Sequence, residues 1–336
     1  MAQLKLNPQD TDTFKLAGTL QAASSGNSEA IRHLSGVQPE TICARSRVQW
    51  MQAMRNLLRT NNTCSQMVMD KIIAVCRFLG DWSLLIQIQS KGSLFPANHE
   101  LVTPYIQLGR WKEAQHLLQQ HSDTALSSTH AQQAGYVEAA LQIPGISYAE
   151  ASKSQLYLTP MDFHHVSDFC WQYADPDIAS LCNLPVFRSA EHWINWLYYC
   201  KQNPHQQLFA IIHREWGFIG SANLHVHDGH GFFYYWLGSD FRGQGYGPAA
   251  VQQLLQLGKD HFAMQDCFTK VFKHNRISQQ ATQKAGFARL PFKAVLPEDN
   301  EVFYYQGKDC AVPELYAHLT ALLVSLGSEI QLAPLV

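Results

Sequence analysis

Apolar residues in the first 150 positions recur mainly at intervals of three and four, which is the spacing of amphipathic helices. Two series that each fall on one helix face are Val48, Met51, Met54, Leu57 and Leu58, and Met67, Ile72, Val75, Phe78 and Leu79. Ser65 is placed to cap the helix that carries the second series. The pattern predicts an all-helical domain over residues 1–150, and Pro and Gly at 144–145 mark a linker over residues 143–154.

The pattern changes after this linker. Short runs rich in aromatic and β-branched residues predict strands at 156–158, 208–213, 216–224, 232–237, 268–272 and 303–306. Segments with helical spacing lie between and after them, at 161–174, 190–200, 248–260, 277–285 and 313–326. The chain is therefore expected to have an α+β fold, with its strands confined to a second domain over residues 151–336.

A short motif occurs twice in the helical half. Leu79-Gly80-Asp81-Trp82 returns as Leu108-Gly109-Arg110-Trp111, 29 positions later, and each copy joins two helical segments. The arrangement resembles the helix–turn–helix unit of tetratricopeptide-type repeats, although their usual period is longer. This resemblance implies a concave surface for a peptide or protein partner. The alternative is a bundle that only packs on the second domain.

Composition limits the classes of function. Only 15% of the residues are charged and the net charge is −2, so nothing favours nucleic acid as a partner. The eight cysteines include no Cys-x-x-Cys pair, which predicts reduced thiols and no metal site. The start of the chain lacks an apolar signal segment and no run is long enough to span a bilayer, so we expect a cytoplasmic protein with no membrane contact.

One glycine-rich turn carries the clearest chemical signal. A short aromatic strand ends at Leu237, and Gly243, Gly245 and Gly247 then precede a helix that begins near Pro248. Glycines leave backbone N–H groups unshielded at the positive end of a helix, which is a geometry that binds phosphate groups. Arg242 adds a fixed positive charge. The turn therefore predicts a site for a phosphate-bearing cofactor.

The spacing of these glycines excludes two common nucleotide motifs. A dinucleotide fold requires Gly-x-Gly-x-x-Gly, which Gly243, Gly245 and Gly247 do not form. A P-loop ends in Gly-Lys-Ser or Gly-Lys-Thr, whereas Gly247 is followed by Pro248 and Ala249.

Several motifs resemble those of the GNAT acetyltransferases. The turn has the form Arg242-x-x-Gly245-x-Gly247, and Asn275-x-x-Ser278 is followed by Lys284-x-Gly286-Phe287. Upstream, the segments at 158–162 and 175–178 are similar to the opening of the ribosomal-protein N-terminal, or Rim-type, branch. The resemblance covers roughly residues 154–308. It implies a mixed-sheet GNAT domain in which strand 268–272 splays away from strand 232–237.

The resemblance also implies how acetyl-CoA, or another acyl-CoA, would be bound. Its pyrophosphate would lie on the turn, and the backbone of two strand residues would pair with the pantetheine arm. Asn275 would hydrogen-bond that arm. The implied binding residues are Trp236, Leu237, Arg242, Gly243, Gln244, Gly245, Tyr246, Gly247 and Asn275.

The catalytic positions depart from the family pattern. Phe232 stands where many Rim-type members carry a glutamate base, and Thr282 stands where many other GNAT enzymes carry a tyrosine acid. Ser278 is retained and is the candidate that protonates the leaving thiolate. His225 is the preferred base, because an imidazole near its ordinary pKa suits the deprotonation of an amine. The other candidates for this role are His227, Glu215, Tyr234 and Tyr235.

These features predict an acyl-CoA-dependent N-acyltransferase whose acceptor is an amine of a peptide or protein, held by the helical domain. The alternative is a weak or inactive acyl-CoA sensor that regulates a partner through that domain. The loss of both usual acid and base residues favours the alternative.

Overall fold

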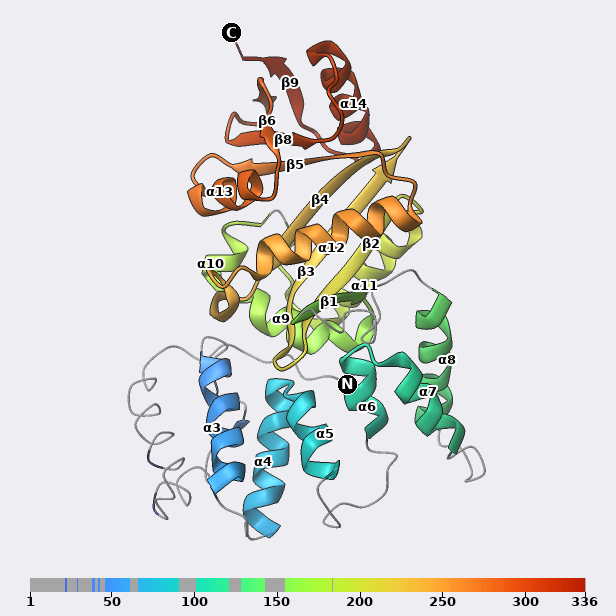
Figure 1. The fold of residues 1–336 in the computed structure, drawn as a ribbon, viewed down its shortest axis with the longest axis vertical. Coiled ribbons are helices and arrows are strands. Elements are labelled where there is room, and N and C mark those ends of the chain that lie inside the picture. The colour runs from blue at the N-terminus through green and yellow to red at the C-terminus, as the bar shows by residue number, and fades with distance from the viewer. Residues whose placement is uncertain are drawn as a thin grey trace.

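The computed structural model describes residues 46–60, 66–90, 101–120, 128–142, 155–182 and 184–335, together with positions 22, 29, 38, 39 and 42. The predicted cap at Ser65 and the linker at 143–154, with the domain boundary inside it, lie outside these residues. An α+β arrangement is confirmed, because the described part begins with helices alone and continues into a mixed sheet (Figure 1).

The first region is a set of helices that pack through their apolar faces. Met51, Met54, Ile72, Val75 and Leu79 are all buried in one core, as the helical spacing predicts. The helices are α3 (Arg47–Thr60), α4 (Gln66–Leu79), α5 (Trp82–Ser90), α6 (Val102–Gln107), α7 (Trp111–Gln120) and α8 (Ser128–Gln142). This region lies beneath one end of the sheet in Figure 1.

The second region is built on a seven-stranded sheet of order β1-β2-β3-β4-β5-β8-β6, in which the β4–β5 pair is parallel and the other pairs are antiparallel. Its strands are β1 (Leu156–Pro160), β2 (Gln206–His213), β3 (Gly217–His227), β4 (His230–Leu237), β5 (Asp266–Phe272), β8 (Glu301–Gln306) and β6 (Ala288–Arg289). Two further strands, β7 (Phe292–Leu296) and β9 (Gln331–Pro334), pair with each other.

Helices cover both faces of this sheet. Alternate side chains of a strand point to opposite faces, so Phe233 packs toward α12 while Phe232 packs toward α14. The helical elements are η4 (Phe163–His165), α9 (Val166–Tyr173), α10 (Pro176–Ala179), α11 (Ala190–Gln202), η5 (Ser239–Phe241), α12 (Tyr246–His261), α13 (Arg276–Lys284) and α14 (Val312–Ser325). Trp193 on α11 is fully buried in the core beneath the sheet.

The tip of the β2–β3 hairpin is inserted into the helical region. Arg55 of α3 donates to the Glu215 carboxylate at 2.6 Å and to the Glu215 carbonyl at 2.7 Å. Its guanidinium also lies 4.2 Å from the centre of the Trp216 ring. Glu215 is thus committed to this contact between the two regions, which removes it as a base near the glycine-rich turn.

Both repeated glycine turns are docking points as well. Gly80 lies against Asp168 of α9, and Gly109 lies against Thr159 of β1. The Tyr157 hydroxyl, on β1, donates to the carbonyl of Leu108. Two turns that look like repeat signals therefore face the sheet domain, and the helical region packs on that domain through them.

Candidate functional site

The glycine-rich turn ends at the N-terminus of α12, where Gly245 is the cap residue. Gly243 and Gly245 have φ of 75° and 83°, in the left-handed region that favours glycine. A Cβ at either position would meet nothing within 4 Å, so both face open space. Within the described chain, the backbone N–H groups of residues 243–247 have no hydrogen-bond acceptor. Five adjacent donors at the positive end of a 16-residue helix can hold an anion.

The side chains of the turn fix its shape. Arg242 is exposed and donates from Nε to the Leu237 carbonyl at 3.4 Å and from Nη2 to the Asp177 carbonyl at 3.3 Å. Gln244 Nε2 donates to the Asp240 carbonyl at 2.7 Å. These bonds hold the guanidinium beside the free N–H groups and leave part of its donor fork for a ligand.

Strands β4 and β5 separate next to this turn. They pair only at residues 230–232 of β4, although both strands continue beyond that point. The Thr269 hydroxyl donates to the Phe233 carbonyl at 2.9 Å, which closes the inner end of the gap. The backbone of β4 beyond Phe233 therefore has no strand partner on this side, in agreement with the predicted splay.

Backbone direction decides which β4 residues face the gap. N–H and C=O groups of successive residues point to opposite neighbours. The Phe233 carbonyl points to β5, whereas the N–H of Gly238 donates to Ile219 of β3 at 2.9 Å. Leu237 and Tyr235 therefore turn their backbone groups to the gap, and Trp236 turns its own to β3. The Trp236 side chain packs on Phe169 with ring centres 5.1 Å apart.

Asn275 and Ser278 lie together at the start of α13. Asn275 Oδ1 accepts from the Ser278 backbone N–H at 3.1 Å, so the amide caps this helix. Its Nδ2 group makes no hydrogen bond inside the described residues and is free to donate. Ser278 is half-buried, and its hydroxyl likewise has no partner in that part of the chain.

His225 occupies a different environment from the one expected of a base. Its ring is fully buried on β3, and Nε2 lies 2.7 Å from the Ser325 hydroxyl of α14. Burial, followed by the nearby His205 and His227, lowers the pKa of His225 to about 4. A ring that is covered and so weakly basic is a poor acceptor for an amine proton, and its position weighs against the predicted role.

A polar pair on the β5 side was missed by the sequence patterns. Lys270 of β5 and Glu301 of β8 form an ion pair, with side chains only 9% and 6% exposed. Tyr234 of β4 lies near enough for burial and the Glu301 carboxylate to raise the pKa of its hydroxyl. Lys270 and Glu301 occur 31 positions apart and carry no motif. Only the pairing of β5 with β8 brings them together.

Phe232, which stands in the place of a glutamate base, lies in an apolar core. Its ring is fully buried among Phe268, Leu319 and other apolar residues beneath α14.

Among the described residues there is no group of His, Cys, Asp and Glu that would hold a metal ion. None of the described helices is long and apolar enough to cross a membrane.

The comparison with protein families supports the assignment of the domain. Residues 155–288 match the model of an acetyltransferase (GNAT) domain. The chain therefore contains a GNAT acetyltransferase domain over this stretch, which includes the whole glycine-rich turn, the splayed strands and Ser278. No curated protein shows significant similarity to the chain.

Several solved acetyltransferase structures are similar at low identity. The acetyltransferase from Salmonella typhimurium that modifies the N-terminal serine of ribosomal protein L7/L12 is 17% identical, covers 46% of this chain and 96% of its own, and gives a TM-score of 0.42. The microcin C7 self-immunity acetyltransferase, solved with acetyl-CoA and AMP, is 16% identical, with coverage of 50% and 99% and a TM-score of 0.43. The ribosomal-protein-S5-alanine acetyltransferase from Vibrio fischeri is 13% identical, with coverage of 46% and 94% and a TM-score of 0.40. These values are too low to transfer a substrate or a residue role.

Proposed function

We propose that this protein is an acyl-CoA-dependent N-acyltransferase that transfers an acyl group, normally acetyl, to an amine of a peptide or protein. The main support is the union of two features inside a GNAT domain: five free backbone N–H groups at the start of α12, and a gap between β4 and β5 that begins beside them. One feature suits a pyrophosphate and the other an amide-containing arm, and CoA carries both.

The residues of the turn would bind the pyrophosphate. The N–H groups of Gly243, Gln244, Gly245, Tyr246 and Gly247 would donate to its oxygens, and Arg242 would add its charge. The backbone of Leu237, with Tyr235 in place of Trp236, would pair with the pantetheine amides. Asn275 would donate from its free amide group.

The reaction would be direct. The amine nitrogen bonds to the acyl carbon, the carbon–sulfur bond breaks, and the thiolate leaves with the electron pair. The thiolate needs one proton, which Ser278 would supply, and the amine must lose one. The amine proton would leave through water and restore the Ser278 hydroxyl, because His225 is covered and the buried Glu301 is already ion-paired with Lys270.

A groove beside the sheet domain favours an acceptor that is a peptide. It has a volume of about 560 Å³ and lies between α8 of the helical region and α11 of the GNAT domain. Tyr136, Phe163 and Tyr198 give it aromatic walls, and Lys201 and Asp162 form an ion pair there. A small metabolite would not require a groove shared between two regions.

Turnover with a panel of amines and peptides tests the proposal. The full chain is incubated with acetyl-CoA and each acceptor, and free CoA and acetylated product are measured by liquid chromatography and mass spectrometry. Chromatography avoids thiol reagents, which would also react with the cysteines of the protein. Formation of acetylated product by the wild-type protein would support the transfer reaction. A Tyr198→Ala variant with a higher KM for the peptide and an unchanged KM for acetyl-CoA would support the whole proposal.

The second candidate function is an acyl-CoA sensor. Phe232 in the place of a glutamate and the buried position of His225 favour it. Tight CoA binding without turnover on any acceptor would establish the sensor and contradict the enzyme.

A further inference from the structure

The turn that leads into the glycine-rich segment rests on residues of α9 and α10. Ser239 donates from its hydroxyl to Asp175 at 2.6 Å. A Cβ on Gly238 would lie 2.3 Å from Gln172 Oε1, so the side chain of Gln172 packs directly on the backbone of this turn. Because the turn has no room for movement toward α9, its position depends on what holds Gln172.

Gln172 shares its anchor with an arginine from the helical region. Gln172 Nε2 donates to the Phe218 carbonyl at 2.8 Å, and Arg47 Nη1 of α3 donates to the same oxygen at 2.7 Å. The next residue of β3, Ile219, accepts the N–H of Gly238 at 2.9 Å. Arg47 and the turn are thus joined through two adjacent carbonyls of β3.

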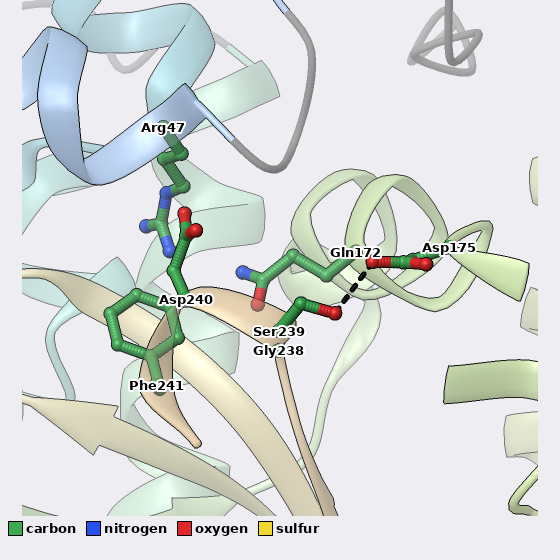
Figure 2. A pocket seen from close by; sticks show the side chains of 7 residues that line it. All are labelled: Arg47, Gln172, Asp175, Gly238, Ser239, Asp240 and Phe241. Atoms are coloured by element: carbon green, nitrogen blue, oxygen red, sulfur yellow. Dashed lines mark hydrogen bonds between the residues drawn. The ribbon is translucent and has the colours of Figure 1, made fainter. Parts of the chain in front are cut away.

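Arg47 itself is completely buried and fully engaged. It also donates to the Leu79 carbonyl at 2.7 Å and to the Trp216 carbonyl at 2.6 Å, which belong to the two different regions. Its guanidinium lies 5.8 Å from the centre of the Phe241 ring. Figure 2 shows this guanidinium reaching from α3 toward Asp240 and Phe241 of the turn.

Very little space is left around these groups. Arg47, Gln172, Asp175 and residues 238–241 enclose a cavity of about 10 Å³, which is room for about one water molecule. A buried guanidinium without its acceptors and a counter-charge is costly. Asp168 and Asp81 supply such a charge, and the carboxylate of Asp240 adds a further one from the turn itself.

We infer that Arg47 is a positioning residue for acyl-CoA binding, through which the helical region holds the turn Gly238–Phe241 and hence the N–H groups of residues 243–247 in place. This inference rests on the proposed function of the glycine-rich turn at residues 242–247. It gives the helical region a role in cosubstrate affinity that is separate from any role in holding the acceptor.

The test uses Arg47→Lys in the full chain. Lysine keeps the charge but cannot donate to three carbonyls in fixed directions. We expect the Kd for CoA, measured by calorimetry, to rise at least fivefold, and the KM for acetyl-CoA to rise with it while the KM for the acceptor stays within twofold. Hydrogen exchange at residues 238–247 should become faster. A general loss of structure would also raise the KM for the acceptor and speed hydrogen exchange outside residues 238–247.

Two further variants complete the experiment. Asp240→Asn removes the counter-charge from the turn side and should raise the Kd for CoA two- to threefold. Arg55→Lys is the matched control, because Arg55 joins the same two regions through Glu215 without reaching the turn, and its Kd for CoA should stay within twofold of wild type.

The outcomes separate the two proposals. If the wild-type protein binds CoA and folded Arg47→Lys binds it equally well, with unchanged exchange in the turn, the inference about Arg47 is wrong and the proposed function stands. If Arg47→Lys does not fold, Asp240→Asn decides by the same criteria. If wild type does not bind CoA at all, the proposed function fails and the inference fails with it.

Discussion

Four of the glycines with a left-handed backbone form two pairs with opposite surroundings. Gly80 and Gly109 have φ of 73° and 62° and connect helices of the first region, whereas Gly243 and Gly245 have φ of 75° and 83° and precede α12. A Cβ on Gly109 would lie 2.2 Å from Thr159, and one on Gly80 would lie 3.0 Å from Asp168. The other pair has no neighbour within 4 Å.

The comparison separates two uses of the same backbone geometry. A turn whose glycine is covered brings two regions of a protein together, because the missing side chain permits close approach. A turn whose glycine is open keeps its N–H groups accessible to a ligand. Left-handed φ values alone do not distinguish these uses, so substitutions at the covered turns should lower stability, whereas substitutions at the open turn should weaken ligand binding.

Gly109→Ala should have the largest effect. Its methyl group must displace Thr159 Cγ2, and the left-handed backbone adds strain, so we expect a loss of about 2–4 kcal/mol in the free energy of unfolding. Urea denaturation measures it. The double variant Gly109→Ala with Thr159→Ser removes the opposing methyl group and should recover part of the loss. A loss no larger than that of Gly327→Ala, where φ is 65° and nothing lies within 4 Å, would contradict the close docking of this turn.

Acid should have the second-largest effect, because it removes the stability that neutral His213 gives to the tip of the β2–β3 hairpin. His213 precedes the hairpin tip, and its Nδ1 accepts the N–H groups of Glu215 and Trp216 at 3.1 and 3.2 Å. Burial, helped by Arg55 and Arg47, lowers the pKa of His213 from 6.5 to about 4. As the pH falls, the His213 ring of the unfolded chain is therefore protonated before that of the folded chain. The stabilisation that depends on neutral His213 is complete above pH 6.5 and is lost as the pH falls toward 4, by up to about 3 kcal/mol.

Urea denaturation at pH 7 and pH 5 checks this dependence. His213→Gln should flatten the change in unfolding free energy between these values, whereas His261→Gln, at an exposed position on α12, should leave it as in wild type. Equal slopes in all three proteins would show that the hairpin does not depend on a neutral His213.

Gly245→Ala should lower stability less than Gly109→Ala does, and should instead weaken CoA binding. The new methyl group enters open space, so stability should fall by only about 1–2 kcal/mol from backbone strain. The methyl group occupies the space that the pyrophosphate would use, and the Kd for CoA should rise about tenfold, or about 1.4 kcal/mol. Gly327→Ala carries the same strain far from the turn and is the control. Unchanged CoA affinity in Gly245→Ala would remove the turn as the binding site.

Arg242→Gln should have the smallest effect. The guanidinium is exposed and partly engaged with carbonyls, so its loss should raise the Kd for CoA about fivefold at low salt and less at high salt, because salt screens exposed charges. Arg289→Gln, at another exposed arginine, should leave the Kd unchanged at both salt concentrations. A Kd that does not respond to Arg242→Gln would mean that the backbone alone holds the anion.

Much of the fold could be predicted because its signals are local. The change from helical spacing to strand runs near residue 150 and the β2–β3 hairpin all follow from neighbouring residues. The short strands β6, β7 and β9 were not predicted, because they pair with distant segments and two to five residues carry too little pattern. The site shows the same division: the glycines of the turn form a motif, whereas Lys270 and Glu301 meet only through strand pairing.

The sequence by itself determined that the chain has a helical part, a sheet part and a turn suited to pyrophosphate. These depend on periodicity and on glycine spacing, which act over a few residues. Only the tertiary structure decided that His225 is covered by α14 and that the repeated glycine turns dock on the sheet domain. It also decided that Arg47 contacts residues 238–241, the segment that precedes the glycine-rich turn. Burial and the sharing of carbonyls depend on which distant segments pack together, and no local pattern encodes that.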